Sequence, residues 1–191
     1  HEGSDGIIAA AASVMGLQTL VSRRNNPQNS FVLTVGMMNG GTQSNIIAEK
    51  VELVGTTRTF NKVFRKELPA MIEEVAKEIA KGYGCTADST YFFGPAPLIN
   101  EHEELNETAR SAVLKIMGED ALIPFDKQMG AEDFSVYMEN TPGVFGFLGC
   151  QNKAKGICCV HHHPAFEVDE DVMPFGAGIY AQFAIDYLAK S

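Results

Sequence analysis

The hydrophobic pattern of the first part of the chain predicts a helix followed by two strands. Apolar residues recur at helical spacing after Asp5, which can cap the helix, and the pattern ends in a polar run closed by Pro27. Two strand-like runs come next, at residues 31–37 and 46–59, with a Gly-Gly turn between them. We therefore expect these two strands to pair antiparallel. The apolar positions of the helix are Ile7, Ala11, Val14, Leu17 and Val21.

A second amphipathic helix is predicted from Asn61 to the glycines at positions 82 and 84. Pro69 inside it removes a backbone hydrogen bond, so we expect a kink or a late start. Residues 86–93 are strand-like. The order helix, strand, strand, helix, strand is that of a split β-α-β fold without its first strand. The apolar face of the helix comprises Phe64, Leu68, Met71, Ile72, Val75 and Ile79.

The pattern changes after the Gly-Pro-Ala-Pro run at residues 94–97, which is the best candidate for a domain boundary. Helices alternate with short apolar strands beyond it. The run at 143–149 is almost entirely apolar, as expected for a strand covered on both faces. We predict an α/β protein with domains at residues 1–95 and 96–191. The expected elements of the second domain are helices at 101–117, 130–138 and 171–190, and strands at 122–125 and 143–149. The last helix carries a stripe of small residues suited to close packing, namely Gly176, Gly178, Ala181 and Ala184.

Charge and cysteine content narrow the class of protein. The formal charge of −9 over 191 residues argues against binding to nucleic acid or to anionic membranes. No stretch approaches the roughly 18 to 20 uninterrupted apolar residues of a membrane helix. The four cysteines form neither a disulfide framework nor a paired C-x-x-C site, which favours reduced thiols and a cytoplasmic setting. The chain opens on His1 in a loop-like stretch, so we expect a piece of a longer protein and leave open an upstream signal peptide.

Three consecutive histidines, His161, His162 and His163, are the clearest candidates for chemistry. Imidazole is a common zinc ligand and is largely unprotonated at neutral pH. The run follows the apolar stretch at 143–149, and open α/β sheets place ligands beyond the ends of such strands. Taken alone, the run fits a metal ligand or ordinary loop histidines, and both remain open.

Two further groups are also ambiguous by themselves. Glu132 and Asp133 lie at a predicted helix start, where they could complement the helix dipole or orient a histidine ligand. Gly41, Asn45 and Arg58 could bind a carboxylate through exposed backbone, an amide and a guanidinium. They equally fit an ordinary hairpin with a surface arginine.

In combination, these groups resemble the dinuclear-metal amidohydrolase/carboxypeptidase family of aminoacylase, hippurate hydrolase and indole-acetyl-amino-acid hydrolase. The resemblance covers nearly the whole chain. It is carried by four segments: His1-x-Gly-x-Asp5-x-Ile7, Gly40-Gly41-Thr42-x-x-Asn45 leading to Gly55-Thr56-x-Arg58-Thr59, Gly130-x-Glu132-Asp133-Phe134, and His162-His163-Pro164-x-Phe166-x-x-Asp169-Glu170.

The resemblance implies a role for each part. Residues 1–95 correspond to an α+β lid, an antiparallel sheet with two helices through which the protein forms a homodimer. Residues 96–191 correspond to the C-terminal part of an α/β catalytic domain. His162 falls on a metal ligand, whereas His161 and His163 are loop residues. Asn45 and Arg58, beside Gly41, fall on residues that reach the partner subunit's site and hold the substrate carboxylate, and Glu132 and Asp133 support the catalytic site.

The implied reaction is hydrolysis of the amide bond of N-acyl amino acids, such as N-acetyl amino acids or hippurate. Two divalent ions, zinc or manganese, or else cobalt or nickel, would activate the attacking water. The family's other ligands and its catalytic glutamate match nothing in this chain. We therefore expect this fragment by itself to bind no metal and to be inactive. A dipeptidase or carboxypeptidase of the same fold and a non-catalytic binding relic are the alternatives.

Overall fold

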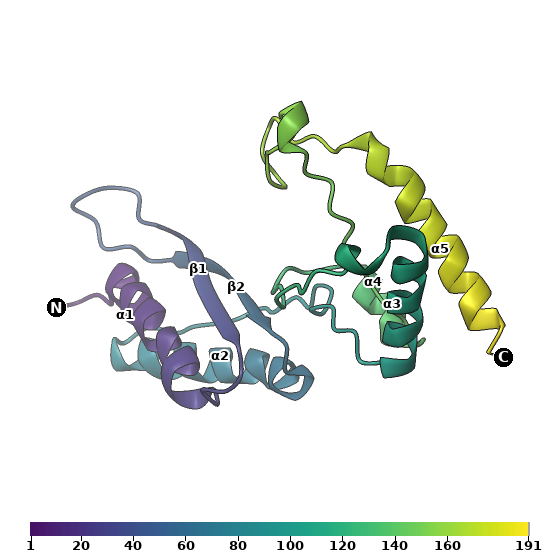
Figure 1. The fold of residues 1–191 in the computed structure, drawn as a ribbon. Helices are drawn as coiled ribbons and strands as arrows, with labels where there is room; N and C mark the ends of the chain where they lie inside the picture. The colour runs from purple at the N-terminus through teal and green to yellow at the C-terminus, as the bar shows by residue number, and fades with distance from the viewer. Residues whose placement is uncertain (191) are drawn as a thin grey trace. The chain divides into compact units, whose positions relative to one another are not determined.

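The computed structural model describes residues 1–190, which divide into two compact units. The first comprises residues 1–97 with 128–133, and the second comprises the other described residues. The described chain contains five α-helices and a two-stranded antiparallel sheet (Figure 1). A mixed helix and strand fold is therefore confirmed. The roles of lid and catalytic domain stay predictions.

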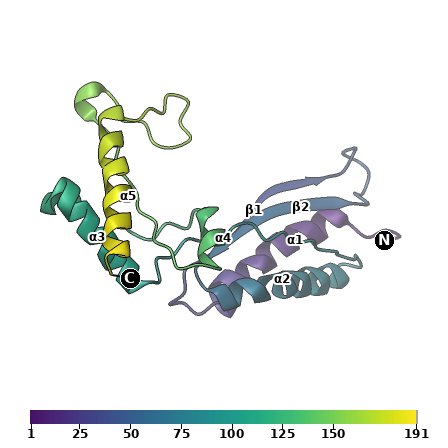
Figure 2. The same cartoon turned by 90° about the vertical axis from the view of Figure 1, so that its right-hand side faces the viewer.

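The first unit is a β-hairpin with two helices on one face. Strands β1 (Phe31–Gly40) and β2 (Val51–Thr59) pair antiparallel as predicted, although β2 begins later than expected. Figure 2 shows α1 (Gly6–Thr19) and α2 (Lys62–Gly82) along the same side of this hairpin. A bulge between Val35 and Met37 interrupts the register.

Helix α1 begins where the sequence predicts. Oδ1 of Asp5 accepts hydrogen bonds from the N–H groups of Ile7 at 2.9 Å and Ile8 at 3.3 Å, which satisfies two otherwise unpaired donors. The helix continues as a π-helical turn, Leu20–Arg24. The predicted inward face was wrong at Ile7 and Ala11, which are exposed. Ala9, Ala10 and Ser13 are buried instead, and their small side chains let the helix lie close to its neighbours. Leu17 is buried as predicted, and Leu20 is buried in the π-helical turn.

The same helical stretch bears on the expected absence of a membrane span. By length and composition, the 19 residues Gly6–Arg24 could cross a membrane, with a mean hydropathy of 1.3. One such helix is weak evidence, because a core helix passes the same test. This one buries Leu17 and Leu20 in a protein core. The absence of a membrane partner stays a prediction.

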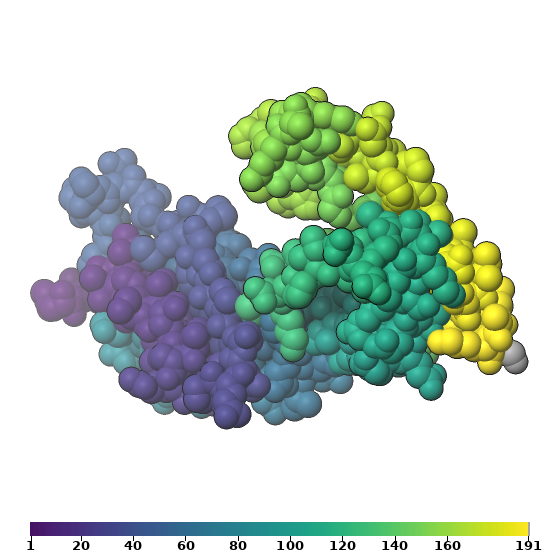
Figure 3. Space-filling model, viewed as in Figure 1, coloured from purple at the N-terminus to yellow at the C-terminus, as the bar shows by residue number. Residues whose placement is uncertain are grey.

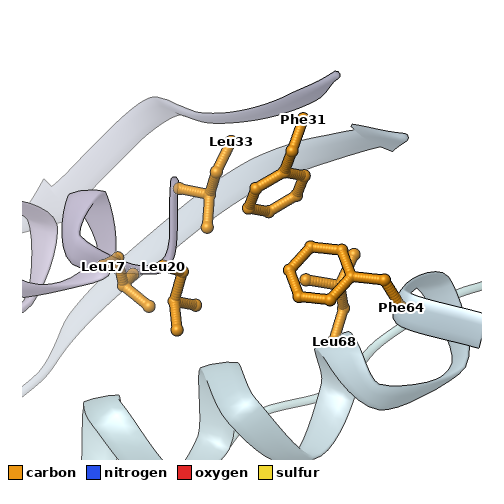
Figure 4. Close-up of a cluster of buried hydrophobic side chains, with 6 residues drawn as sticks. All are labelled: Leu17, Leu20, Phe31, Leu33, Phe64 and Leu68. Atoms are coloured by element: carbon orange, nitrogen blue, oxygen red, sulfur yellow. The ribbon is translucent and has the colours of Figure 1, made fainter. Parts of the chain in front are cut away.

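The core of the first unit joins the π-helical turn, β1 and the start of α2 (Figure 4). The rings of Phe31 and Phe64 meet edge to face, with their centroids 5.0 Å apart. Asn61 caps α2 by accepting from the N–H groups of residues 63 and 64. The helix starts directly after this cap, so the late start considered for Pro69 is not observed. The cluster comprises Leu17, Leu20, Phe31, Leu33, Phe64 and Leu68.

Replacing Leu68 with alanine should lower the free energy of unfolding by about 2–5 kcal/mol. Leu68 is completely buried, so the substitution removes packed methyl groups and leaves a cavity. Val63→Ala, on the same helix at a position 68% exposed, is the matched control and should change the free energy by less than about 0.5 kcal/mol. Urea unfolding followed by circular dichroism measures both. Equal effects in the two variants would contradict this account of the core.

The predicted third strand at 86–93 is wrong, because the segment forms no ladder with β1 or β2. A strand is defined by backbone hydrogen bonds to a neighbouring strand, and within residues 1–190 this segment forms no such ladder. The segment is held by side chains instead: the Tyr91 hydroxyl and Oγ1 of Thr57 are hydrogen bonded at 2.5 Å. The local composition predicted an extended backbone for residues 86–93, but it could not show whether this segment would pair with another strand.

The second unit is built on two helices, α3 (Glu103–Met117) and α5 (Met173–Leu188), which pack together. A methyl group at Gly178 would lie 3.4 Å from the side chain of Ile116, so this glycine permits the close approach expected of the small-residue stripe. Nζ of Lys115 lies 2.6 Å from Oδ1 of Asp186 and joins the two helices by an ion pair.

The predicted strands at 122–125 and 143–149 are wrong, since neither segment pairs with another strand among the described residues. Their aromatic residues pack on one another: the Phe125 and Phe147 ring centroids are 4.7 Å apart, and these side chains are 63% and 64% exposed. An apolar run becomes a buried strand only where other strands and helices cover it. The helix predicted at 130–138 shortens to α4 (Phe134–Met138).

Candidate functional site

The three histidines lie on an exposed loop of the second unit, residues 158–168, which we call the histidine loop (yellow-green in Figure 3). His162 has a φ of 68°, the one positive φ of a non-glycine residue among residues 1–190. A left-handed backbone costs such a residue roughly 1–2 kcal/mol. Two turn hydrogen bonds hold it, from His163 N to Val160 O at 3.2 Å and from Phe166 N to His163 O at 2.9 Å.

The structure distinguishes the three imidazoles. Nδ1 of His163 accepts a hydrogen bond from Ala165 N at 3.1 Å, so its lone pair is engaged. The ring of His161 lies against Phe166, with centroids 4.8 Å apart. Within the described part of the chain, the imidazole of His162 makes no hydrogen bond. The imidazole nitrogens of His161 likewise make no hydrogen bond within that part of the chain, so the nitrogens of both side chains are open to a ligand, and the ligand role of His162 stays a prediction.

A single histidine is not a metal centre. Among residues 1–190, no group of three or more His, Cys, Asp or Glu side chains is arranged to hold a metal ion. The residues present therefore do not by themselves fit a dinuclear centre, and we assign no chemical step through a metal to them. His162 could supply one ligand of a site completed by other residues.

The histidine loop ends at a buried carboxylate. Asp169 is 6% exposed, and its oxygens accept hydrogen bonds at 2.6 Å from Nδ2 of Asn152 and at 2.6 Å from Nζ of Lys155. The hydrogen bond from Lys155, and to a smaller extent the one from Asn152, lowers the pKa of the Asp169 carboxyl. The hydrogen bond between Lys155 and Asp169 also raises the pKa of the Lys155 amine. In the sequence, Asp169 stood out only as part of a motif. Asn152 and Lys155 were missed, although an Asn followed by Lys-Ala-Lys-Gly is typical of a capped turn.

Gly41 and Asn45 lie in the loop that joins the two strands. Gly41 has a φ of 79°, which glycine adopts without steric cost, and it directly follows the last residue of β1. Asn45 is exposed in a turn where Ile46 N donates to Gln43 O at 3.3 Å. Both residues are therefore accessible to a partner or a substrate.

Arg58 lies near the other end of the hairpin, where it pairs with Val32. Its Nη1 donates a 2.9 Å hydrogen bond to the carbonyl oxygen of Met129. The strand from Val51 to Arg58 spans about 23 Å at the usual rise per residue. One chain therefore does not bring Asn45 and Arg58 together.

Glu132 and Asp133 come shortly after the carbonyl that Arg58 contacts, within the segment 128–133 that packs with the first unit. An isolated β-bridge between Pro97 and Ala131 fixes this segment. Glu132 is half-buried and Asp133 is exposed. Both carboxylates thus belong to the segment whose Met129 carbonyl accepts the hydrogen bond from Arg58, and their supporting role stays a prediction.

The family of the chain is established by its match to known proteins. Residues 2–186 match the model of peptidase family M20/M25/M40. The chain belongs to this family. This match to the M20 family confirms the resemblance that the sequence motifs indicated.

Individual M20 relatives are similar over nearly the whole chain. IAA-amino acid hydrolase ILR1-like 2 of Arabidopsis thaliana is 34% identical over 97% of this chain and 42% of its own length. N-acetyl-L-cysteine deacetylase of Bacillus subtilis is 36% identical over 89% and 39%. The crystal structure of the Bacillus subtilis YXEP protein, a dinuclear metal binding peptidase, has a TM-score of 0.81 and 28% identity over 97% and 47%. The chain spans less than half the length of each of these relatives.

Proposed function

We propose that the chain is part of a metal-dependent amidohydrolase that cleaves the amide bond of N-acyl amino acids. The observation that carries this proposal is its similarity, across 97% of its residues, to an IAA-amino acid hydrolase. A deacetylase of an N-acetyl amino acid is similarly related. The chain covers under half of both proteins, so a complete active site would need residues beyond those described.

His162 is the residue of this chain that we expect to bind one of two divalent ions. It is exposed and its imidazole makes no hydrogen bond within residues 1–190, whereas Nδ1 of His163 accepts one from Ala165 N. We expect zinc or manganese, or else cobalt or nickel, with the remaining ligands supplied by residues outside this chain.

Arg58 and Asn45 would bind the substrate carboxylate. A guanidinium carries five N–H donors in a fork that matches a carboxylate, and the bond to Met129 uses one nitrogen of Arg58. Because Asn45 lies at the opposite end of the hairpin, both could reach one substrate only from two copies of the chain. We therefore propose a homodimer in which Arg58 of one chain and Asn45 of the other share one site.

A peptidase acting on dipeptides or peptide C-termini is the alternative function. It is favoured by the 28% identity to a structure described as a dinuclear metal binding peptidase. A peptidase and a deacylase can use the same carboxylate-binding residues and differ in the group on the acyl side of the bond. A relic that binds ligands without catalysis would have neither activity.

Substrate assays of the intact enzyme should show hydrolysis of N-acetyl amino acids or hippurate at least about tenfold faster, in kcat/KM, than of dipeptides. Amide cleavage is measured by release of the free amino acid, after addition of manganese or zinc. Faster cleavage of dipeptides would favour the peptidase. No hydrolysis of any of these substrates by protein that contains metal would favour the binding relic.

We also propose a cytoplasmic location. All four cysteines are unpaired thiols, namely Cys85, Cys150, Cys158 and Cys159. Free thiols persist in reducing compartments.

A further inference from the structure

The histidine loop lies inside a closed loop of backbone. Asp169 N donates a hydrogen bond to Cys150 O at 3.0 Å, so the two ends of the segment between these residues lie side by side. A small hairpin begins after Cys150, in which Asn152 and Ile157 exchange two hydrogen bonds of 2.9 Å. The histidine loop connects the end of this hairpin to Asp169. Its two ends are therefore held close together by backbone contacts.

Side-chain hydrogen bonds also hold together the two ends of the segment between Cys150 and Asp169. Asn152 caps the 3-10 turn Lys153–Lys155 through its Oδ1 and uses its Nδ2 to donate to Asp169. Lys155, at the end of that turn, donates to Asp169 from Nζ. Asp169 is the one buried charged residue among residues 1–190, so its two strong partners offset the loss of hydration.

The carboxylate also fixes the segment after the histidine loop. Oδ1 of Asp169 accepts a hydrogen bond from Asp171 N at 3.3 Å and so caps the turn Glu170–Val172, which leads into α5. Lys155 reaches Asp171 as well, with Nζ 2.5 Å from Oδ2. One carboxylate thus connects the hairpin before the histidine loop, the end of that loop, and the turn that leads into α5.

We propose that Asp169 is a positioning residue for His162, which it holds in one loop conformation through its bonds to Asn152 and Lys155. The left-handed backbone of His162 is unfavourable for a histidine and persists only where the surrounding structure imposes it. The turn hydrogen bonds of residues 163 and 166 impose it locally. Asp169 limits the conformations in which this turn can form, because it closes the loop that contains it.

The value of this positioning for hydrolysis rests on the proposed function, in which His162 is a ligand, but the positioning itself can be tested without metal or substrate. Amide hydrogen exchange of the 191-residue chain reports it directly. The reporter amides are those of His163 and Phe166, whose bonds frame His162, and the reference amides are those of helix α3. A general loss of stability would affect both sets, whereas a loss of positioning affects the first set alone.

Asp169→Asn and Lys155→Met should each lower protection of the His163 and Phe166 amides about tenfold, with α3 unchanged. Asn keeps the shape of the side chain and removes its charge. Lys155→Arg should retain most of the protection, because it keeps a cationic donor. Lys153→Met is the matched control on the same turn and should have no effect, since Lys153 is exposed.

Unchanged protection of the two loop amides in Asp169→Asn or Lys155→Met would overturn the proposal. An equal loss of protection in α3 would also overturn it, because Asp169 would then be a general stabilising residue. Failure of the intact enzyme to hydrolyse N-acyl amino acids would refute the proposed function and leave the exchange result standing. The two proposals can therefore fail separately.

Discussion

Replacing His162 with alanine in the intact enzyme should reduce bound metal and amide hydrolysis together, with activity falling about 100-fold or more. A ligand set that loses one imidazole holds its ion less tightly, and hydrolysis depends on that ion. The His162 imidazole makes no hydrogen bond in the described structure, and its ring contact is with the neighbouring His161, with centroids 6.1 Å apart. Metal content by atomic spectroscopy and kcat/KM for an N-acetyl amino acid measure the two effects.

His161→Ala is the matched control, because it removes a neighbouring imidazole that contacts Phe166 and has no proposed metal role. We expect its metal content to equal that of the unmodified enzyme. Full activity and metal content in His162→Ala would refute the ligand assignment. Loss of metal in His161→Ala with none in His162→Ala would move the assignment to His161.

The part of the fold that could be predicted from sequence is the part whose partners lie nearby in the chain. The caps at Asp5 and Asn61 depend on side chains two or three residues from the amides that they bind. The pairing of β1 with β2 depends on a short connection between them. Local patterns contain the information that such contacts require.

The failures concern segments that need a distant partner. Residues 86–93, 122–125 and 143–149 have the composition of strands, but a strand forms only when another edge pairs with it. None of the three segments pairs with another strand among the described residues, and Phe147 in the last of them is largely exposed. Composition measures the tendency of a segment and cannot show whether its partner is present.

The candidate site divides in the same way. Motifs selected His162, Arg58 and Asn45, but the sequence could not show that Asn45 and Arg58 lie at opposite ends of a hairpin. The register of the folded hairpin places Arg58 opposite Val32, at the end away from the loop that contains Asn45. The sequence likewise identified Asp169 as part of a motif. Its hydrogen bonds to Lys155 and Asn152 could be recognised only in the folded structure.

Substituting Arg58 with alanine should lower kcat/KM for N-acyl amino acids about 10- to 100-fold, mainly by raising KM, with metal content unchanged. The guanidinium would be lost as a partner for the substrate carboxylate. Arg58→Lys should recover little, because an ammonium cannot reproduce the planar fork. Thr56→Ala, an exposed position two residues earlier on the same face of β2, is the matched control and should leave KM unchanged. Loss of metal in Arg58→Ala would show that Arg58 supports the metal site instead.

Mixing Arg58→Ala and Asn45→Ala chains tests whether the two residues act from different subunits. If they do, each mixed dimer contains one site with both native residues and one with neither. Random reassembly yields mixed dimers for about half of the molecules, so about a quarter of the native activity should return. If both residues served a site within one chain, every site would lack one of them and mixing would restore nothing. The hairpin favours the first result, because Asn45 lies in the loop before Val51 and β2 spans about 23 Å from Val51 to Arg58.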